Sequence, residues 1–130
     1  MTEPAKETTP ALIASQEGVV TTVTINDAPW NRMSMEFMDE LEVLVEKLAS
    51  DKSVRAVVIT GAGDEHFSVG MHLKQLAASV KSRGDMESVL DQRLRVLAAI
   101  ENMDKPWIAT LYGYCLGGGL ELPLACHFRL

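Results

Sequence analysis

The sequence predicts an α/β fold in which strands and helices alternate along the chain. Three observations support this fold class: a β-branched run over residues 54–60, two long segments with apolar residues at helical spacing, and glycine-rich turns after the strands. The expected order of elements is β-β-α-β-(α)-α-β-α. At 130 residues the chain is long enough for one domain with a buried core.

The first expected element is a β-hairpin. It follows a polar segment at residues 1–10, which we expect to be a flexible tail. Two apolar runs, at residues 11–15 and 19–25, flank Gln16-Glu17-Gly18. Both runs are rich in Val, Thr or Ile and a glycine stands in the connection, which is the pattern of a hairpin.

A helix and a strand are expected next. Ser34 is the predicted N-cap, and apolar residues then recur at helical spacing until about Ser50. The run at residues 54–60 has the composition of a strand in a sheet that is covered on both faces. Acidic residues of the helix are expected to form a solvated face, namely Asp39, Glu40, Glu42 and Glu46.

Two helices are expected between residues 70 and 101. A short one at residues 71–80 follows Gly70, and Gly84-Asp85 then breaks the chain. The second is amphipathic over residues 86–100, and we place Arg93 and Arg95 off its apolar stripe.

The last expected elements are a strand at residues 107–111 and a helix after the glycine cluster. Proline is tolerated only near the first turn of a helix, so Pro123 predicts a helix start at about Gly119 or Leu120. Residues 126–130 look like the opening of another strand, and we therefore expect the sequence to be cut short.

Charge and composition argue against several classes of protein. The formal net charge is −6 without a block of basic residues, which disfavours nucleic-acid binding. The absence of an apolar leader and of a CxxC pair makes the cytoplasm the expected compartment. We expect no membrane partner, because the weakly charged residues 107–125 include three glycines, Glu121 and Pro123. The three histidines lack metal-ligand spacing, so we expect no metal.

The segment Gly117-Gly118-Gly119-Leu120-Glu121-Leu122 points most directly to chemistry. Glycines between a strand and a helix let a ligand approach the backbone, and the unpaired amides of a helix start can hold a developing oxyanion. The Gly118 amide and the Glu121 carboxylate would share one face of the helix. The pattern equally fits a tight turn with a favourable first-turn acid. It fits neither a Walker A loop nor a dinucleotide fingerprint.

A second candidate segment, residues 66–74, follows the predicted buried strand, where ligand crevices of α/β sheets tend to lie. Gly70 allows a sharp turn that would present the amide of Met71. For the side chains alone, the favoured interpretation is a loop that leads into a helix, with Met71 and Leu73 packed into the core.

Taken together, these segments resemble the crotonase (enoyl-CoA hydratase/isomerase) family. Residues 105–109 (KPWIA), 113–122 (GYCLGGGLEL) and 125–126 (AC) resemble its K-P-x-I-A, N-G-x-x-x-G-G-G-x-E-L and A-C-D motifs. Residues 67–73 (FSVGMHL) resemble its F-x-x-G-x-D-L segment, and Asn31 resembles the Asn of its early N-A-L/M stretch. The resemblance runs from about Val19 to Leu130.

The resemblance implies a β-β-α spiral fold, of which residues 11–130 would be the N-terminal part, and a coenzyme A thioester as ligand without a separate cofactor. It implies an oxyanion hole made by the backbone amides of Met71 and Gly118. It also implies a substrate site along Met71, His72, Leu73 and Lys74, with Lys74 near the nucleotide end. Glu121 falls where hydratases of the family carry one of two catalytic glutamates, and the second would lie beyond Leu130.

The function implied by the resemblance is that of a hydratase-type lyase, which adds water in syn fashion to a 2-enoyl-CoA. The alternatives are an isomerase or other crotonase reaction, or a non-catalytic CoA-binding fragment. We expect little turnover from the 130 residues alone, and a homotrimer or hexamer for the full-length protein.

The sequence departs from the family pattern at several positions. His72, Tyr112 and His127 replace the usual Asp, Asn and Asp, while Trp107 and Pro123 are bulkier or stiffer than the norm. We expect His72 and Trp107 to alter the thioester pocket or its walls.

Overall fold

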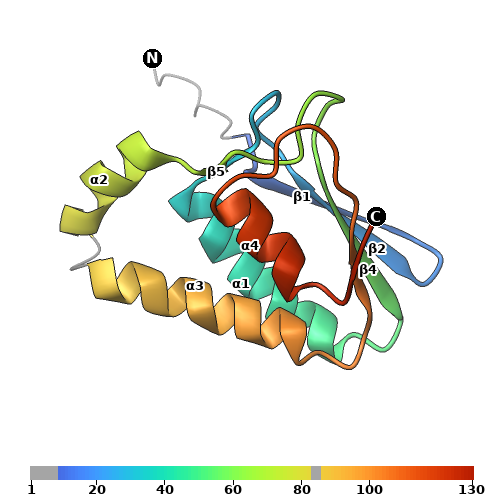
Figure 1. Ribbon diagram of the computed structural model, residues 1–130. Helices are drawn as coiled ribbons and strands as arrows, with labels where there is room; N and C mark the ends of the chain where they lie inside the picture. The colour runs from blue at the N-terminus through green and yellow to red at the C-terminus, as the bar shows by residue number, and fades with distance from the viewer. Residues whose placement is uncertain (1–8, 83–85) are drawn as a thin grey trace, which may run out of the picture.

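The computed structural model describes residues 9–82 and 86–130, in which a twisted sheet is packed against helices (Figure 1). The sheet has the strand order β1-β2-β4-β6-β7 and a separate two-stranded pair joins β3 to β5. The strands are β1 (Leu12–Glu17), β2 (Val20–Ile25), β3 (Arg32–Met33), β4 (Ala56–Gly61), β5 (Gly70–Met71), β6 (Trp107–Ala109) and β7 (Phe128–Arg129). The helices are α1 (Met35–Ser50), α2 (Leu73–Ser82), α3 (Met86–Glu101) and α4 (Gly118–Ala125).

Strands β1 and β2 form the predicted hairpin. They are antiparallel, from Leu12 opposite Ile25 to Glu17 opposite Val20, and Gly18 in the turn has a φ of 60°. Strand β2 then pairs in parallel with β4, and β4 with β6. The carboxyl ends of these three parallel strands therefore meet at one edge of the sheet.

Helix α1 begins as predicted. The Ser34 hydroxyl accepts a hydrogen bond from the Phe37 amide at 3.0 Å, which satisfies one of the free donors of the first turn. The buried face of the helix, which carries Phe37, Leu41, Val45 and Leu48, contributes to the hydrophobic core together with β-strand residues such as Val57 and Ile59.

Only one face of β4 is fully covered in the described residues. Val57 and Ile59 are completely buried, whereas Val58 and Thr60 on the other face are partly exposed. In Figure 1 the helices α1, α3 and α4 lie on the same side of the sheet. The expectation of a sheet covered on both faces is therefore wrong for this part of the chain, and the β-branched run reflects strand preference rather than double burial.

Helix α3 is rotated relative to the prediction. Val89, Arg93, Val96 and Ile100 are buried, whereas Leu94 is 65% exposed. Placing Arg93 off the buried stripe was therefore wrong, because its side chain packs against Gly118 at the start of α4 and pairs with Glu121 of that helix. Arg95 is exposed as expected.

The acidic side of α1 is only partly solvated. Asp39 accepts a hydrogen bond from Gln92 at 2.8 Å, and Glu42 forms an ion pair with Arg95 at 3.0 Å, so both side chains face α3. Glu46 is exposed, in agreement with the prediction.

Helix α4 begins at Gly118, one or two residues earlier than Pro123 led us to expect, and Pro123 lies inside the helix rather than in its first turn. Pro123 has no N–H to donate to the carbonyl of Gly119, so this short helix has one hydrogen bond fewer than its length allows. Strand β7 follows and pairs in parallel with β6, as the apolar end of the sequence predicted.

Some expectations fall outside the described residues, namely most of the tail at residues 1–10 and the break at Gly84-Asp85. Within the described part of the chain, no helix has both the length and the apolar character needed to span a bilayer.

Candidate functional site

The candidate site is built by two loops that leave the carboxyl ends of β4 and β6. Phe67 N donates to Tyr112 O at 2.9 Å, and Leu116 N donates to Ser68 O at 3.0 Å. These backbone bonds join the loop before β5 to the loop before α4. The two motif segments, far apart in sequence, are therefore side by side at the strand ends, where α/β folds place their ligands.

Asn31 ties the first loop to the start of α1. It is fully buried and has a φ of 51°, a left-handed conformation that asparagine adopts more readily than most residues. Its Nδ2 donates to Ala62 O at 2.9 Å and to His66 O at 2.7 Å, and its carbonyl accepts from the Ser68 hydroxyl at 2.6 Å. The Asn that the family resemblance singled out is thus a structural tie behind the site.

Two ionisable groups at the edge of these loops have shifted pKa values. Burial raises the pKa of Tyr112 above its ordinary value, and its hydroxyl donates to Gly61 O at 2.6 Å. Partial burial works to raise the pKa of Asp27, but hydrogen bonds from the Arg32 side chain and amide outweigh it and hold that pKa below its usual value. Tyr112 therefore ties the loop after β6 to the end of β4, and Asp27 is a stable anion in the connection between β2 and β3.

The amide of Met71 points away from strand β3. His72 N donates to Met33 O at 3.2 Å, in register with the pairing of Met71 and Met33. Successive N–H groups of an extended strand point to opposite sides, so the Met71 N–H faces the opposite edge of β5. Helix α4 contacts β5.

The amide of Gly118 is a free donor at the start of α4. Gly119 N donates to Leu116 O at 2.8 Å, and Leu120 N and Glu121 N donate to Gly117 O at 3.0 and 3.1 Å. In the described residues the Gly118 N–H has no such acceptor, as is usual for the first residue of a helix.

Close backbone approach brings Gly70 of β5 against the start of α4. A Cβ added at Gly70 would lie 3.0 Å from Gly118 N and 2.7 Å from Leu116 O. A Cβ at Gly119 would collide with Ser68 O. The glycines of both motifs are therefore required by contact between β5 and α4, in addition to their role in turning the chain.

Glu121 lies on the first turn of α4 with its side chain 56% exposed, and its Oε2 accepts a hydrogen bond from Arg93 Nε at 3.1 Å. Sequence reasoning missed Arg93. The signal was present, because residues 89, 93, 96 and 100 follow helical spacing and place an arginine inside an apolar stripe.

The remaining predicted substrate-binding residues occupy the start of α2. His72 Nδ1 accepts a hydrogen bond from Gln75 N at 3.3 Å, which makes this side chain a cap of the helix. Leu73 is 74% exposed, so its expected place in the core is wrong. Met71 is half-buried and Lys74 is exposed.

Trp107 and His127 are structural. Trp107 is fully buried at the first residue of β6, and its expected effect on the thioester pocket stays a prediction. His127 Nδ1 accepts from Trp107 N at 2.9 Å and its Nε2 donates to Glu101 O at 3.0 Å. His127 therefore joins the end of α3 to the start of β6.

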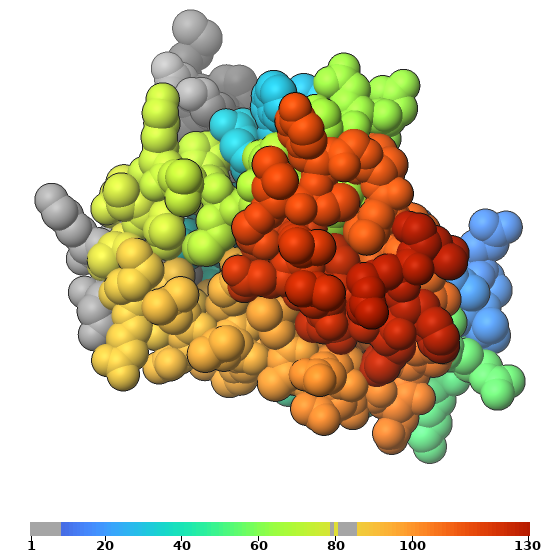
Figure 2. Space-filling view, in the orientation of Figure 1, coloured from blue at the N-terminus to red at the C-terminus, as the bar shows by residue number. Residues whose placement is uncertain are grey.

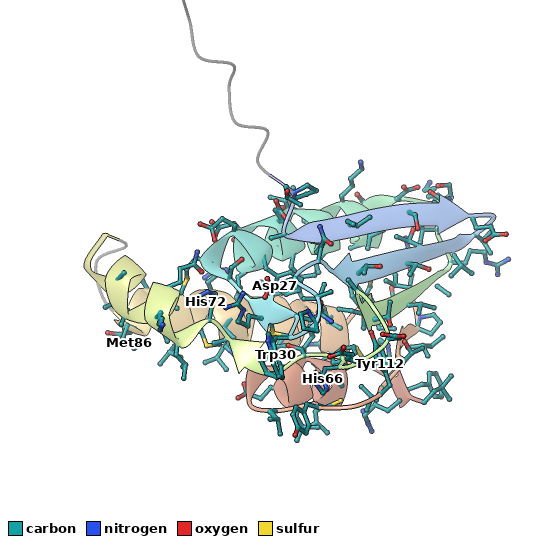
Figure 3. All side chains as sticks on the ribbon, turned by 90° about the horizontal axis from the view of Figure 1, so that it is seen from above. Asp27, Trp30, His66, His72, Met86 and Tyr112 are labelled. Carbon is teal, nitrogen blue, oxygen red and sulfur yellow. The ribbon has the colours of Figure 1, made fainter. Side chains whose placement is uncertain are left out.

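An aromatic stack covers the outer side of the loops. The His66 ring lies between Trp30 and Tyr114, with centroid distances of 5.1 and 4.4 Å. Figure 3 shows Trp30 and His66 next to each other on neighbouring loops. Figure 2 shows α4 and the loop before it, in orange and red, at the surface of the same molecule.

A pocket of about 510 Å³ lies elsewhere, between α1 and α3, where residues such as Val45, Val96 and Met103 line it. Neither β5 nor α4 contributes to its walls. Among the described residues no group of three or more His, Cys, Asp or Glu side chains suits a metal ion.

Comparison with known proteins gives a consistent result. The family profile described as enoyl-CoA hydratase/isomerase matches residues 15–130. A probable enoyl-CoA hydratase of Bacillus subtilis is 33% identical over 120 residues, which is 92% of this chain and 46% of that protein. The chain thus spans about half the length of the curated relative that it matches.

Two solved structures show the same fold. An enoyl-CoA hydratase from Bacillus anthracis has a TM-score of 0.78 and 28% identity, over 92% of this chain and 46% of that chain. A monofunctional enoyl-CoA isomerase from M. smegmatis has a TM-score of 0.71 and 34% identity, over 93% of this chain and 49% of that chain. The predicted crotonase-type α/β fold is confirmed for this chain, which matches about half of each of those structures.

Proposed function

Because the chain belongs to the enoyl-CoA hydratase/isomerase family, we propose that the protein acts on a coenzyme A thioester bound at the Met71 and Gly118 amides. The observation that supports this proposal is the close approach of Gly70 to Gly118, because Gly118 has a free helix-start amide and the Met71 amide, next to Gly70, points out of its strand pair. Both donors belong to the backbone, so the half-buried side chain of Met71 is free to vary.

The chemistry suits a thioester whose carbonyl oxygen gains negative charge. Addition of water to a 2-enoyl thioester, or movement of its double bond, passes through an enolate-like state. Preorganised N–H donors stabilise that state more than the neutral substrate, and one such donor contributes about 3–4 kcal/mol in other enzymes. The start of α4 adds the favourable end of a helix dipole.

Within this family we propose a hydratase, in which Glu121 helps to activate the water that adds to the double bond. The carboxylate is 56% exposed, so water can reach it, and it stands three residues after Gly118 on the same short helix. An isomerase is the second candidate, because the structural neighbour from M. smegmatis, named an isomerase, is 34% identical to this chain.

The start of α2 is the proposed binding surface for the coenzyme A moiety. Met71, His72, Leu73 and Lys74 run outward from the amide site, and the exposed Lys74 ammonium suits the phosphates of the nucleotide end. A homotrimer or hexamer remains a prediction from the family resemblance, and a cytoplasmic location remains a prediction from the sequence.

Hydration of crotonyl-CoA by the full-length protein tests the proposal. We expect Glu121→Gln to lower kcat by about 100-fold or more, because removal of a positioned acid or base costs roughly 10²–10⁴ in rate. Glu46→Gln is the matched control. It makes the same change at an exposed carboxylate on α1 and should leave kcat unchanged. Unchanged hydration by Glu121→Gln would contradict the role of Glu121.

A second substrate separates the two candidate reactions. Conversion of a 3-enoyl-CoA to the 2-enoyl isomer without hydration of crotonyl-CoA would favour the isomerase. The 130-residue chain is expected to bind a saturated acyl-CoA but to turn over little substrate, which isothermal titration and the same hydration assay check together.

A further inference from the structure

We propose that Arg93 is the positioning residue that orients the Glu121 carboxylate for catalysis. The inference rests on the proposed function of Glu121 and adds a residue from a different element, α3, to the site. Neither the glycine-rich motif nor the residues at the start of α2 include it.

Arg93 holds one oxygen of Glu121 and leaves the other free. Its Nε lies 3.1 Å from Glu121 Oε2, while the second carboxylate oxygen has no hydrogen-bond partner among the described residues. The arginine side chain is only 7% exposed, whereas that of Glu121 is 56% exposed. A rigid buried donor thus fixes a carboxylate that would otherwise sample several rotamers on the surface of a short helix.

The contact between Arg93 and Glu121 is not an arrangement that stabilises the fold. Arg93 Nη1 is buried without a partner in the described residues, and a buried charged donor left unsatisfied is costly. The guanidinium also lies close to the start of α4, where the helix dipole disfavours a cation. Its ion partner is mostly solvated, so the pair itself contributes little to folding.

Gly118 connects this ion pair to the proposed oxyanion hole. A Cβ at Gly118 would collide with Arg93 Nη2 and would lie 3.0 Å from Nη1. The missing side chain therefore makes room for the guanidinium against the residue whose amide is free. Arg93, Gly118 and Glu121 form one unit, in which the arginine packs against Gly118 and holds the carboxylate of Glu121 in place.

A purely structural role predicts different behaviour. If Arg93 served only to dock α3 on α4, its removal would lower stability and would affect binding and turnover together. If it positions Glu121, its removal should lower kcat with little change in KM, and stability should stay level or rise because the unsatisfied buried charge is gone.

The test uses Arg93→Gln and Arg93→Met in the full-length protein, with Arg95→Gln as the matched control. Arg95 lies two residues further along α3, is 61% exposed and pairs with Glu42, so its variant should match the wild type. We expect both Arg93 variants to lower kcat for crotonyl-CoA by about 10- to 100-fold, and Arg93→Lys to recover part of the loss. The melting temperature should not fall.

A double-mutant cycle distinguishes positioning from an independent effect. In the Glu121→Gln background, Arg93→Gln should change kcat by less than about threefold, since residues that act as a unit are not additive. If the wild type is active, full additivity of the two substitutions overturns the inference, and so does an Arg93→Gln variant with unchanged kcat. Either result leaves the proposed function intact.

A measurement without turnover keeps the two proposals separate. In the wild type, ¹³C-labelled Glu121 should show a single ordered carboxylate environment, and Arg93→Gln should replace it with motional averaging, whereas Arg95→Gln should not. An inactive wild type would overturn the proposed function, and this spectrum would still decide whether Arg93 orients Glu121. Identical spectra of wild type and Arg93→Gln would refute the positioning role.

Discussion

Gly70 and Gly118 touch through their backbones: a Cβ on Gly70 would lie 3.0 Å from Gly118 N and 2.7 Å from Leu116 O. Gly70 also has a φ of 96°, a conformation that L side chains rarely adopt. Gly70→Ala should therefore displace β5 from α4, separate the two proposed amide donors and weaken acyl-CoA binding. We expect a destabilisation of roughly 3 kcal/mol or more, measured by urea unfolding, together with at least a tenfold loss of affinity.

Gly18→Ala is the matched control for that substitution. Gly18 also has a positive φ, of 60°, but an added Cβ there meets nothing within 4 Å, and the residue lies in the β1–β2 turn. Its variant should cost only about 1–2 kcal/mol of backbone strain and bind acyl-CoA normally. Equal effects of the two substitutions would show that backbone strain, and not the contact with α4, explains the requirement for glycine at position 70.

The buried Asn31 predicts an ordering of three variants. Asn31→Ala removes the donor to Ala62 O and His66 O and leaves buried carbonyls unsatisfied, so we expect a loss of about 3 kcal/mol. Asn31→Asp should be at least as harmful, because it directs a carboxylate oxygen at those carbonyls. Asn31→Gly should be milder than Asn31→Ala by about 1 kcal/mol, since glycine accepts the φ of 51°. Urea unfolding gives the order, and an Asp variant of wild-type stability would contradict it.

Local signals made most of the fold predictable from the sequence. The hairpin turn at Gly18, the Ser34 cap and the glycines before α4 act through their own backbone or that of near neighbours, so they can be recognised without a partner element. The two candidate segments could be predicted for the same reason, because glycines mark places where the chain must turn or approach another backbone closely.

What was missed depends on contacts between elements. Two apolar stripes compete on α3, one through Leu90 and Leu94 and one through Val89 and Val96, and burial of the second requires space for Arg93, which packs against Gly118 and has an ion partner on α4. That partner, Glu121, lies on another helix. The direction of the Met71 amide likewise depends on the two-residue strand pair between β3 and β5. A strand pair this short leaves no periodic pattern in the sequence, so it could not be predicted.

His127, which stands where the family usually has Asp, should stabilise the junction of α3 and β6. Its ring accepts from Trp107 N and donates to Glu101 O, so His127→Ala loses both bonds and should cost about 1–2 kcal/mol in urea unfolding. His127→Asn should fall between wild type and alanine, because a short amide can replace only the acceptor for Trp107. Hydration kinetics should be unaffected in both variants, since this junction lies at the opposite end of β6 from the site.

The two thiols should react at different rates, and the rate of both should rise with pH. Burial raises the pKa of Cys126 to about 12, against an ordinary value of 9.0. Burial also raises the pKa of Cys115, which is partly exposed. At about pH 8 both are protonated thiols, and iodoacetamide requires the thiolate, so native labelling should be slow and should reach Cys115 before Cys126. Mass spectrometry of timed samples gives the order, and Cys115→Ser should remove the faster phase alone.

The same shift makes stability depend on alkaline pH. Between pH 9.0 and about 12 the unfolded chain loses the Cys126 proton while the folded chain keeps it. Ionisation of the unfolded state favours unfolding, so this contribution to stability is complete below pH 9.0 and declines as pH rises above it. Cys126→Ala, which leaves a small cavity but no ionisable group, should show a shallower fall of the urea midpoint over that range. Parallel pH profiles for wild type and Cys126→Ala would mean that the buried thiol ionises as readily in the folded chain as in the unfolded one.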